Sequence, residues 1–328
     1  MQNNFLVRIC LAVALFLSSA SSVFSATAPD MTGIVKETYD YAVKDGDTLR
    51  LDVYYNPDLP FEGKRPVIIF SFGGGWEAGA RADGAGSYTP FLNTMTRYGY
   101  IGVGIDYRLG YLDARKKGKV EDISICSPLI AGTVDRNIYD CAHDAIMNAV
   151  EDLFDATTFV VNNAERWNAD DKRVIISGIS AGGINSLTAE NLLVNKDPLA
   201  VDHLPEGFSY AGVVSGCGAI WHDYDQPLHW DNQPCPIMFI HGNSDPIVPF
   251  ARVVNEADNF NIEGSRVIAD EFKTKGWPYM LVIGEGKIHA YGGEAFAYDH
   301  ELINRFIRNY VLNKIPKSVE IVETSLQK

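Results

Sequence analysis

The sequence has few basic residues for its length: its 328 residues include 28 Lys and Arg against 42 Asp and Glu, a formal net charge of −14. A surface of this sign repels nucleic-acid phosphates and anionic lipid headgroups, so we expect no nucleic-acid partner and no stable membrane insertion. The sequence also lacks a Cys-x-x-Cys pair, so nothing in it indicates a structural zinc site. We expect neither a resident metal ion nor an organic cofactor.

The apolar run at the N-terminus, Ile9 to Leu17, is too short to span a bilayer. It follows a single basic residue, Arg8, and small residues then lead to a cleavage site after Ser25. This pattern is typical of a secretory signal peptide. We therefore predict a signal peptide at residues 1–25 and an exported protein, periplasmic or extracellular, that forms a single domain over residues 26–328.

Cysteine is rare, with five residues in the whole chain, and four of them follow the predicted signal peptide: Cys126, Cys141, Cys217 and Cys235. An even number of cysteines in an exported chain favours disulfides. Pairing of nearest neighbours gives Cys126–Cys141 and Cys217–Cys235. The alternative is that some of the four are free, buried thiols.

The rest of the chain shows no internal repeat and no low-complexity linker, and 46% of all residues are hydrophobic. Residues 37–57 alternate between apolar and polar side chains around Asp45-Gly46, which predicts a β-hairpin. Short apolar runs predict buried strands at residues 65–72, 99–107, 173–178, 210–216, 236–242 and 279–286. Helices are expected at residues 88–99 and 137–167, and from about residues 181, 249 and 294. Strands that alternate with helices predict a mostly parallel sheet with helices on both faces.

Two connections are too long to be simple turns, residues 107–136 and residues 217–235. Ligands of a parallel sheet bind outside the carboxyl ends of its strands. We expect both segments to be insertions that lie over that edge of the sheet and form the walls of a pocket.

Residues Gly178 to Gly182 match the pattern G-x-S-x-G. Between an expected strand and an expected helix, this pattern predicts a very tight turn that presents Ser180 at the start of the helix. Glycine is required at both ends because a side chain there would collide with neighbouring backbone. The N-terminus of the helix favours negative charge beside the serine. Ser180 is therefore the candidate nucleophile, although a buried strand followed by a helix can show such a pattern for packing reasons alone.

A serine hydroxyl needs a base that accepts its proton, and the base needs an acid that orients it. His289 follows the last expected strand, and Asp245 lies in a short polar turn after the preceding strand. The order Ser180, Asp245, His289 along the chain is the order found in α/β-hydrolases. The alternatives are that His289 is a solvated loop histidine and that Asp245 is an ordinary turn residue before proline.

Other residues are open candidates for these two roles. His300 is a second candidate base, although it falls within an expected helix. His241 ends a strand, and we expect it to support the turn that contains Asp245. Asp223 and Asp299 are weaker candidates for the acid.

The tetrahedral intermediate of acyl transfer carries an oxyanion, which needs preorganised amide donors. One donor is expected from Ala181, directly after the serine. The other is expected from the loop Phe72 to Trp76, where three consecutive glycines follow a strand. Glycines let the backbone turn its amides toward a ligand, although a flexible turn would have the same composition.

Five motifs together resemble those of bacterial secreted carboxylesterases of the α/β-hydrolase superfamily: "FGGGW", "DYRL", "GISAGG", "HGNSD" and "IHAYGG". The resemblance covers about residues 35–315. It is strongest to the branch akin to hormone-sensitive lipase and to feruloyl and acetyl esterases with an HGGGW-type loop. It implies an α/β-hydrolase fold, with Ser180 as nucleophile and Asp245 and His289 as its partners. It also implies Gly73, Gly74 and Ala181 as the donors of the oxyanion hole.

Two positions depart from this family pattern. Phe72 stands where the glycine triplet is usually opened by a histidine, which organises the loop. Ile179 stands before the serine, where one branch of the family carries glutamate. No N-terminal helical cap is evident, so the two long segments are expected to supply the walls of the substrate site.

Four aromatic residues are candidate substrate contacts: Trp76, Trp221, Tyr224 and Trp230. Exposed aromatic rings stack on sugars or on aromatic acyl groups. The equal alternative is that the rings of residues 217–235 pack that segment onto the body of the protein. The polar residues of the same segment show no spacing typical of a metal site.

The function favoured by the sequence is that of a serine carboxylesterase that forms an acyl-enzyme on Ser180. Its substrates would be small-molecule or oligosaccharide esters, with removal of acetyl or hydroxycinnamoyl groups from carbohydrate fragments as one specific form. One alternative is a serine exopeptidase of the prolyl-peptidase type, although the chain has no room for the extra domain that such enzymes use. A second alternative is a non-catalytic binding protein that retains the fold.

Overall fold

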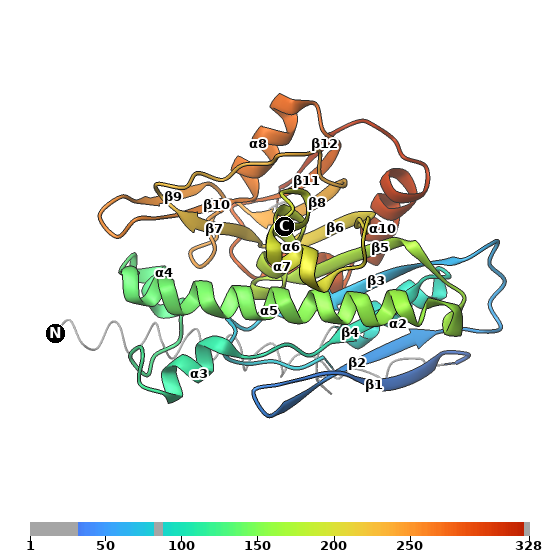
Figure 1. Ribbon diagram of the computed structural model, residues 1–328. Helices are drawn as coiled ribbons and strands as arrows, with labels where there is room; N and C mark the ends of the chain where they lie inside the picture. The colour runs from blue at the N-terminus through green and yellow to red at the C-terminus, as the bar shows by residue number, and fades with distance from the viewer. Residues whose placement is uncertain (1–31, 82–87, 325–328) are drawn as a thin grey trace.

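The computed structural model describes residues 32–81 and 88–324, and the predicted signal peptide lies outside them. Its centre is a nine-stranded sheet with the order β1-β2-β4-β3-β5-β6-β8-β11-β12 (Figure 1). In chain order the strands are β1 (Val35–Lys44), β2 (Asp47–Tyr55), β3 (Arg65–Ser71), β4 (Ile101–Ile105), β5 (Ala169–Ile179), β6 (Gly212–Gly216), β8 (Ile237–Gly242), β11 (Tyr279–Glu285) and β12 (Val319–Thr324). β1 and β2 form the predicted hairpin, β2 also pairs antiparallel with β4, and the remaining pairs are parallel.

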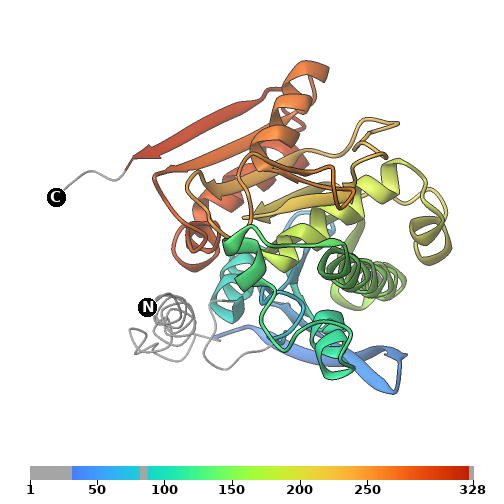
Figure 2. The ribbon, with the colours of Figure 1, turned by 90° about the vertical axis from the view of Figure 1, so that its left-hand side faces the viewer.

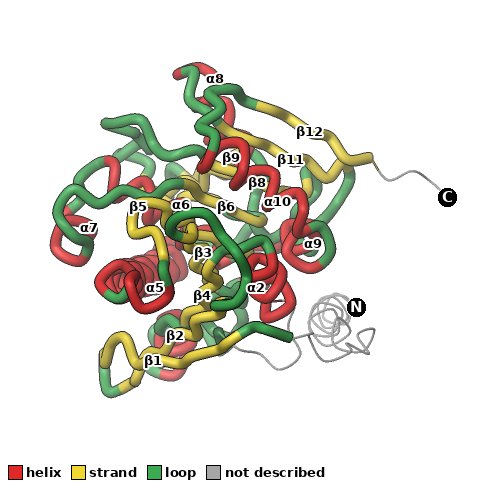
Figure 3. Tube along the Cα trace, turned by 90° about the vertical axis from the view of Figure 1, so that its right-hand side faces the viewer, coloured by secondary structure: helices red, strands yellow, loops and turns green. Residues whose placement is uncertain are grey.

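Helices cover both faces of this sheet (Figure 3). On one face α5 (Arg136–Asn162) packs against α6 (Ala181–Val194), and on the other α2 (Tyr88–Arg97) packs against α9 (Tyr291–Ala297) and α10 (His300–Phe306). The other helical segments are α3 (Gly110–Lys116), α4 (Cys126–Ala131), η1 (Ala164–Trp167), α7 (Pro198–His203), α8 (Ser265–Lys275) and η2 (Ile307–Leu312). The predicted α/β class is confirmed, as are the helices expected at residues 88–99, at 137–167 and from residue 181.

The central strands are buried on both faces, which explains their continuous apolar sequences. Every residue of β3, β4, β6 and β8 is buried. The long helix α5 begins where the side chain of Asp135 accepts a hydrogen bond from the amide of Ile138 (2.9 Å). Such an N-cap satisfies an amide that the helix itself leaves unpaired. None of the helices in the described residues combines the length and the apolar sequence needed to cross a bilayer.

A second, three-stranded antiparallel sheet has the order β7-β10-β9 and consists of β7 (Ala219–Asp223), β9 (Arg252–Asn255) and β10 (Phe260–Gly264). The helix expected from about residue 249 is therefore wrong, because a hairpin occupies this segment and α8 begins only at Ser265. The β-branched residues Val253 and Val254 pair across the hairpin, and Asn259 takes the left-handed conformation (φ 53°) in its turn. β10 also pairs with β7, a segment distant in the sequence. The local pattern of apolar residues cannot predict such a long-range pairing.

The last strand, β12, was not expected from the sequence. It adds to the edge of the large sheet beside β11 and leads to the C-terminus (Figure 2). Most of its residues are exposed, so it lacks the apolar run that marks the inner strands. The helix expected from about residue 294 is present in two parts, as α9 and α10, and continues into the π-helical turn η2.

The predicted disulfides Cys126–Cys141 and Cys217–Cys235 are wrong, because all four cysteines are free thiols in the structure. Cys217 directs its thiol to the backbone carbonyl of His289 (2.9 Å), whereas Cys235 lies beside Glu190 of α6. Cysteines that follow each other in the sequence are thus not paired in space. The alternative of free, largely buried thiols holds.

Candidate active site

Ser180 lies at the sharp turn between β5 and α6. Its backbone takes φ 55° and ψ −120°, a sparsely populated conformation for a residue with a side chain. A Cβ at Gly178 would overlap the backbone of Gly182, and one at Gly182 would overlap the carbonyl of Ser71. The two glycines are therefore required by close backbone contacts, and the strained turn holds the serine hydroxyl away from the sheet at the N-terminus of α6.

Three remote segments meet at this hydroxyl. Nε2 of His289, in the loop between β11 and α9, lies 2.9 Å from Oγ of Ser180. Nδ1 of the same ring lies 2.6 Å from Oδ2 of Asp245, in the turn after β8. The side chain of Asp245 is fully buried, whereas that of His289 is 21% exposed. The serine is thus hydrogen-bonded to an imidazole whose other nitrogen donates to a buried carboxylate, the arrangement that activates a serine nucleophile.

The carboxylate of Asp245 is held by more than the imidazole. Its Oδ1 accepts hydrogen bonds from the amides of Ile247 (2.8 Å) and Val248 (3.0 Å), and His241 contacts its Oδ2. Burial alone raises the pKa of Asp245, but the hydrogen bonds from His241 and His289 outweigh burial and hold this pKa well below its ordinary value. Asp245 is therefore ionised at neutral pH and able to stabilise a positive charge on His289.

Cys217, His241 and Asp245 place three potential metal-ligand atoms within 4.8 Å of one another. These atoms already serve the site: the thiol of Cys217 donates to the carbonyl oxygen of His289, and Nε2 of His241 faces Asp245. A metal ion here would displace those contacts and compete for the carboxylate. We therefore assign Cys217 and His241 to the support of His289 and Asp245.

The glycine loop after β3 lies against the serine. A Cβ at Gly73 would press on the carbonyl of Ile179 and on the side chain of Ser180. Gly74 has φ 124°, and a Cβ there would overlap the carbonyl of Ala78. Both positions thus require glycine, and Gly73 brings the backbone of the loop against the serine.

Amides at this point are free to act as donors. Among the hydrogen bonds between described residues, none uses the amide of Gly73, Gly74 or Ala181. Ala181 is the first residue of α6, where helix amides have no partner within the helix. These three unpaired amides are therefore the candidate donors of an oxyanion hole.

Phe72, in the place of the usual histidine, organises the glycine loop by packing. Its ring stacks on Tyr107 (centroids 4.2 Å apart, planes at 16°), and the hydroxyl of Tyr107 donates to the carbonyl of Phe72 (2.8 Å). At the other end of the loop, the indole nitrogen of Trp76 donates to Oδ1 of Asn185 in α6 (2.9 Å). The loop is thus fixed at both ends without the histidine.

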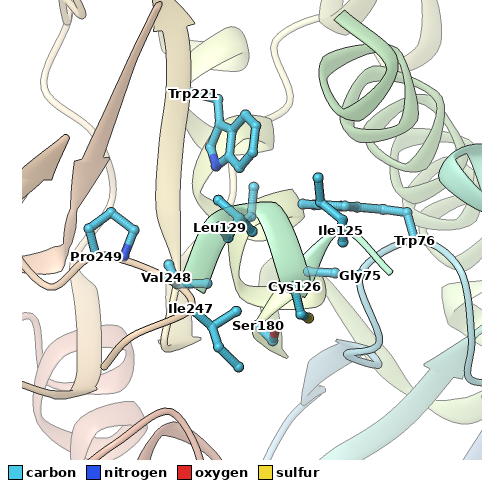
Figure 4. Close-up of a pocket in the computed structure, with 12 residues that line it drawn as sticks. Gly75, Trp76, Ile125, Cys126, Leu129, Ser180, Trp221, Ile247, Val248 and Pro249 are labelled. Atoms are coloured by element: carbon cyan, nitrogen blue, oxygen red, sulfur yellow. The ribbon is translucent and has the colours of Figure 1, made fainter. Parts of the chain in front are cut away.

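A pocket of about 330 Å³, counting the part open to solvent, lies beside Ser180 (Figure 4). Its lining residues are Gly75, Trp76, Ile125, Cys126, Leu129, Ser180, Ala181, Ile184, Trp221, Ile247, Val248 and Pro249. None of them is charged, and nearly all present apolar atoms. An uncharged, mostly apolar lining suits a small neutral group.

The candidate substrate contacts fall into two groups. Trp76 and Trp221 line the pocket, as both long insertions contribute to its walls. Tyr224 is 39% exposed and Trp230 is buried against Phe272 of α8 (centroids 5.5 Å apart), and neither lines this pocket. Trp230 therefore follows the packing alternative, whereas Tyr224 is an exposed ring outside this pocket.

The rival candidates for base and acid have other partners. Nε2 of His300 donates to the carbonyl of Phe296 (2.7 Å). Asp223 pairs with Arg136 (2.7 Å), and Asp299 caps α10.

The sequence did not identify which residues of α4 line the pocket. Its pocket residues, Cys126 and Leu129, lie in a six-residue helix inside a segment that reads as a loop. The only signal was the length of the segment.

The chain was compared with known proteins by sequence and by fold. The BD-FAE family model, which describes an esterase family of the α/β-hydrolase type, matches residues 51–126. No curated protein matches the chain.

Among solved structures, similar ones include esterase 2 of the Planctomycetes species Thermogutta terrifontis. With propionate bound it is 21% identical, covers 86% of this chain and 96% of its own, and has a TM-score of 0.59. With butyrate bound the values are 20%, 88%, 98% and 0.57. The form phosphorylated by paraoxon is 21% identical, covers 86% and 95%, and has a TM-score of 0.54. The chain therefore has the α/β-hydrolase fold, as the sequence resemblance implied.

Proposed function

We propose that this α/β-hydrolase is a serine carboxylesterase that acts through an acyl-enzyme on Ser180. The observation that carries the proposal is the hydrogen-bonded chain from Ser180 through His289 to the buried, ionised Asp245. The unpaired amides of the glycine loop and of α6 are the proposed oxyanion donors. Nucleophile, base, orienting acid and oxyanion donors are the parts that acyl transfer needs.

The first half of the reaction forms the acyl-enzyme. Nε2 of His289 accepts the proton of the Ser180 hydroxyl as Oγ attacks the ester carbonyl carbon. The oxyanion that develops accepts hydrogen bonds from the amides of Gly73, Gly74 and Ala181, in whichever pair the bound carbonyl faces. Asp245 stabilises the imidazolium, which then protonates the leaving alkoxide, so that the alcohol departs and the acyl group remains on Oγ.

The second half reverses these roles. A water molecule loses a proton to Nε2 of His289 and attacks the acyl carbon. The bond between that carbon and Oγ breaks, His289 returns the proton to Ser180, and the carboxylic acid leaves. Each proton is transferred through one imidazole nitrogen, so the fixed distance of 2.9 Å between Nε2 and Oγ serves both halves.

The comparisons support this proposal through the fold and through the BD-FAE match to residues 51–126. The similar esterase 2 structures are described with propionate or butyrate bound and as phosphorylated by paraoxon. We propose, as the finer form, that the natural substrates are neutral esters of carbohydrate fragments that carry acetyl or hydroxycinnamoyl groups. The predicted signal peptide supports an exported enzyme that meets such fragments outside the cytoplasm.

The test is a comparison of the wild type with Ser180→Ala. We expect labelling by a fluorophosphonate and hydrolysis of p-nitrophenyl butyrate in the wild type, and loss of both in the variant. Ser209→Ala, at a serine outside the pocket beside Ser180, is the matched control and should retain both. Turnover of dipeptidyl p-nitroanilides in preference to esters would replace the proposal by the exopeptidase alternative. Absence of labelling in the wild type would favour a binding protein.

A further inference from the structure

Trp221 is a buried side chain with an unused donor. It lies in β7, is 5% exposed and lines the pocket beside Ser180. Its indole N–H donates to no atom of the described residues. Figure 4 shows the indole nitrogen on the edge of the ring that faces the pocket. A donor buried without an acceptor destabilises a protein by about 1–3 kcal/mol, so its presence calls for a physical reason.

The orientation of this ring is fixed by its neighbours. Trp221 stacks on Tyr139 of α5 (centroids 5.8 Å apart, planes at 22°) and meets Trp76 edge to face (6.4 Å, 82°). Trp76 differs in that its own indole nitrogen already donates to Asn185. Of the two tryptophans in the wall, only Trp221 therefore offers its N–H to a molecule in the pocket.

The position of the pocket identifies which part of an ester enters it. The leaving oxygen must lie within reach of Nε2 of His289 in order to be protonated. His289 does not line this pocket, whereas Ala181, a proposed oxyanion donor, and Gly75 and Trp76, which follow the other two donors in the chain, do. When the carbonyl oxygen of the ester lies at the oxyanion donors, its acyl group points into this pocket.

We propose that Trp221 is a specificity-determining residue whose indole N–H binds an oxygen atom carried by the acyl group beyond its carbonyl. The inference rests on the proposed esterase function. The preferred substrates are esters of neutral acids with a hydroxyl, ether or phenol oxygen in the chain. A carboxylate is disfavoured because no residue that lines the pocket carries a compensating positive charge. Phenylalanine would line the wall equally well for a purely alkyl acyl group and would bury no unpaired donor.

The experiment compares matched ester pairs in which oxygen replaces one carbon. The p-nitrophenyl pairs are butyrate with methoxyacetate, and valerate with 3-methoxypropionate and with ethoxyacetate. A fourth pair is methyl 4-methylcinnamate with methyl 4-hydroxycinnamate. For each pair, the ratio of kcat/KM for the oxygen-containing ester to that for its alkyl partner is measured in the wild type and in Trp221→Phe. Because the ratio is compared between two enzymes, differences in intrinsic reactivity cancel.

We expect Trp221→Phe to lower this ratio about three- to tenfold for at least one oxygen position, as loss of one hydrogen bond predicts. Trp230→Phe, at a buried tryptophan outside the pocket, should leave every ratio unchanged. A ratio that is the same in wild type and Trp221→Phe for all pairs would overturn the proposal and would assign the N–H to a fixed water. If the wild type hydrolyses none of the alkyl esters, or if Ser180→Ala hydrolyses them as well as the wild type does, the esterase proposal itself fails.

Discussion

Nε2 of His241 lies 3.2 Å from Oδ2 of Asp245, and the same carboxylate oxygen lies 2.6 Å from Nδ1 of His289. The side chains of His241 and Asp245 are both fully buried, so this oxygen is held between two imidazoles away from bulk water. Nδ1 of His241 lies 2.8 Å from Oγ of Ser265, at the start of α8. His241 therefore connects the acid of the triad to a helix of the scaffold.

Replacement of His241 should alter the hydrogen bonding of Asp245, the acid, and leave the side chain of His289, the base, in place. In His241→Phe, Asp245 loses one of the hydrogen bonds that lower its pKa, so its pKa should rise. Hydrogen bonds to charged groups contribute about 1.5–3 kcal/mol, so we expect kcat/KM for p-nitrophenyl butyrate to fall roughly ten- to hundredfold. The fall of kcat/KM on the acid side should also begin at a higher pH than in the wild type. The pH profile of kcat/KM measures both effects.

The control for this prediction is Ser265→Ala. It removes the partner of Nδ1 but leaves the contact between His241 and Asp245, so the pH profile should keep its shape while thermal stability falls. A His241→Phe enzyme with a wild-type pH profile would mean that the amides of Ile247 and Val248 suffice to position the acid.

A second prediction concerns Gly74 in the glycine loop. In Gly74→Ala the new Cβ overlaps the carbonyl of Ala78, and the residue is held at φ 124°, which alanine rarely adopts. The loop must shift, and loss of one oxyanion donor lowers kcat by about 100- to 1,000-fold. Gly207→Ala is the matched control: its φ is also positive, at 72°, but no atom lies within 4 Å of its Cβ. Steady-state kinetics should show the large loss only for Gly74→Ala.

The turn that holds Ser180 was predictable because the glycines that it requires form a short motif between two segments with apolar patterns. Gly178 and Gly182 are required by close backbone contacts with each other and with Ser71 of β3. The placement of Asp245 and His289 after successive strands could also be inferred, since parallel strands end at one edge of a sheet. These features carry most of the proposed chemistry.

Other features depend on contacts between distant segments and were missed. The strand β9 forms because β10 pairs with it and with β7, so a helix was expected there instead. The free state of Cys217 reflects a carbonyl acceptor at His289, 72 positions away. Neither contact could be predicted from the spacing of residues along the chain. The contribution of α4 to the pocket wall could not be predicted from it either.

A third prediction concerns the length of the acyl group. Leu129 of α4 lines both the pocket beside Ser180 and a neighbouring cavity of about 280 Å³ bounded by β9 and β10. Leu129→Ala should join the two spaces and admit longer chains. Because each methylene in an apolar pocket discriminates by roughly tenfold or more, we expect the kcat/KM ratio of hexanoate to butyrate p-nitrophenyl esters to rise about tenfold. Leu193→Ala, in α6 outside both spaces, should leave the ratio unchanged.

Glu190 has an unusual environment for a carboxyl group. It lies in α6 with only 2% of its surface exposed, and its Oε1 accepts a hydrogen bond from the amide of Cys235 (2.7 Å). Its Oε2 has no partner among the described residues. Burial raises the pKa of Glu190 to about 7, although the hydrogen bond from Cys235 lowers it in part. The folded protein therefore keeps a proton on this group at a pH where the unfolded chain has lost it.

The fourth prediction follows from that difference in proton binding. Between pH 4.5, the ordinary pKa, and about 7, the folded state binds more protons at Glu190 than the unfolded state, so the free energy of unfolding falls as pH rises and levels off above pH 7. Glu190→Gln keeps the size and the acceptor but cannot ionise. Urea unfolding should find it more stable than the wild type at pH 8.5, by on the order of 2–3 kcal/mol, and nearly equal at pH 5. Glu206→Gln, on an exposed loop, should show no such pH dependence. A stability difference that is the same at both pH values would mean that Glu190 is already ionised in the folded protein at pH 5.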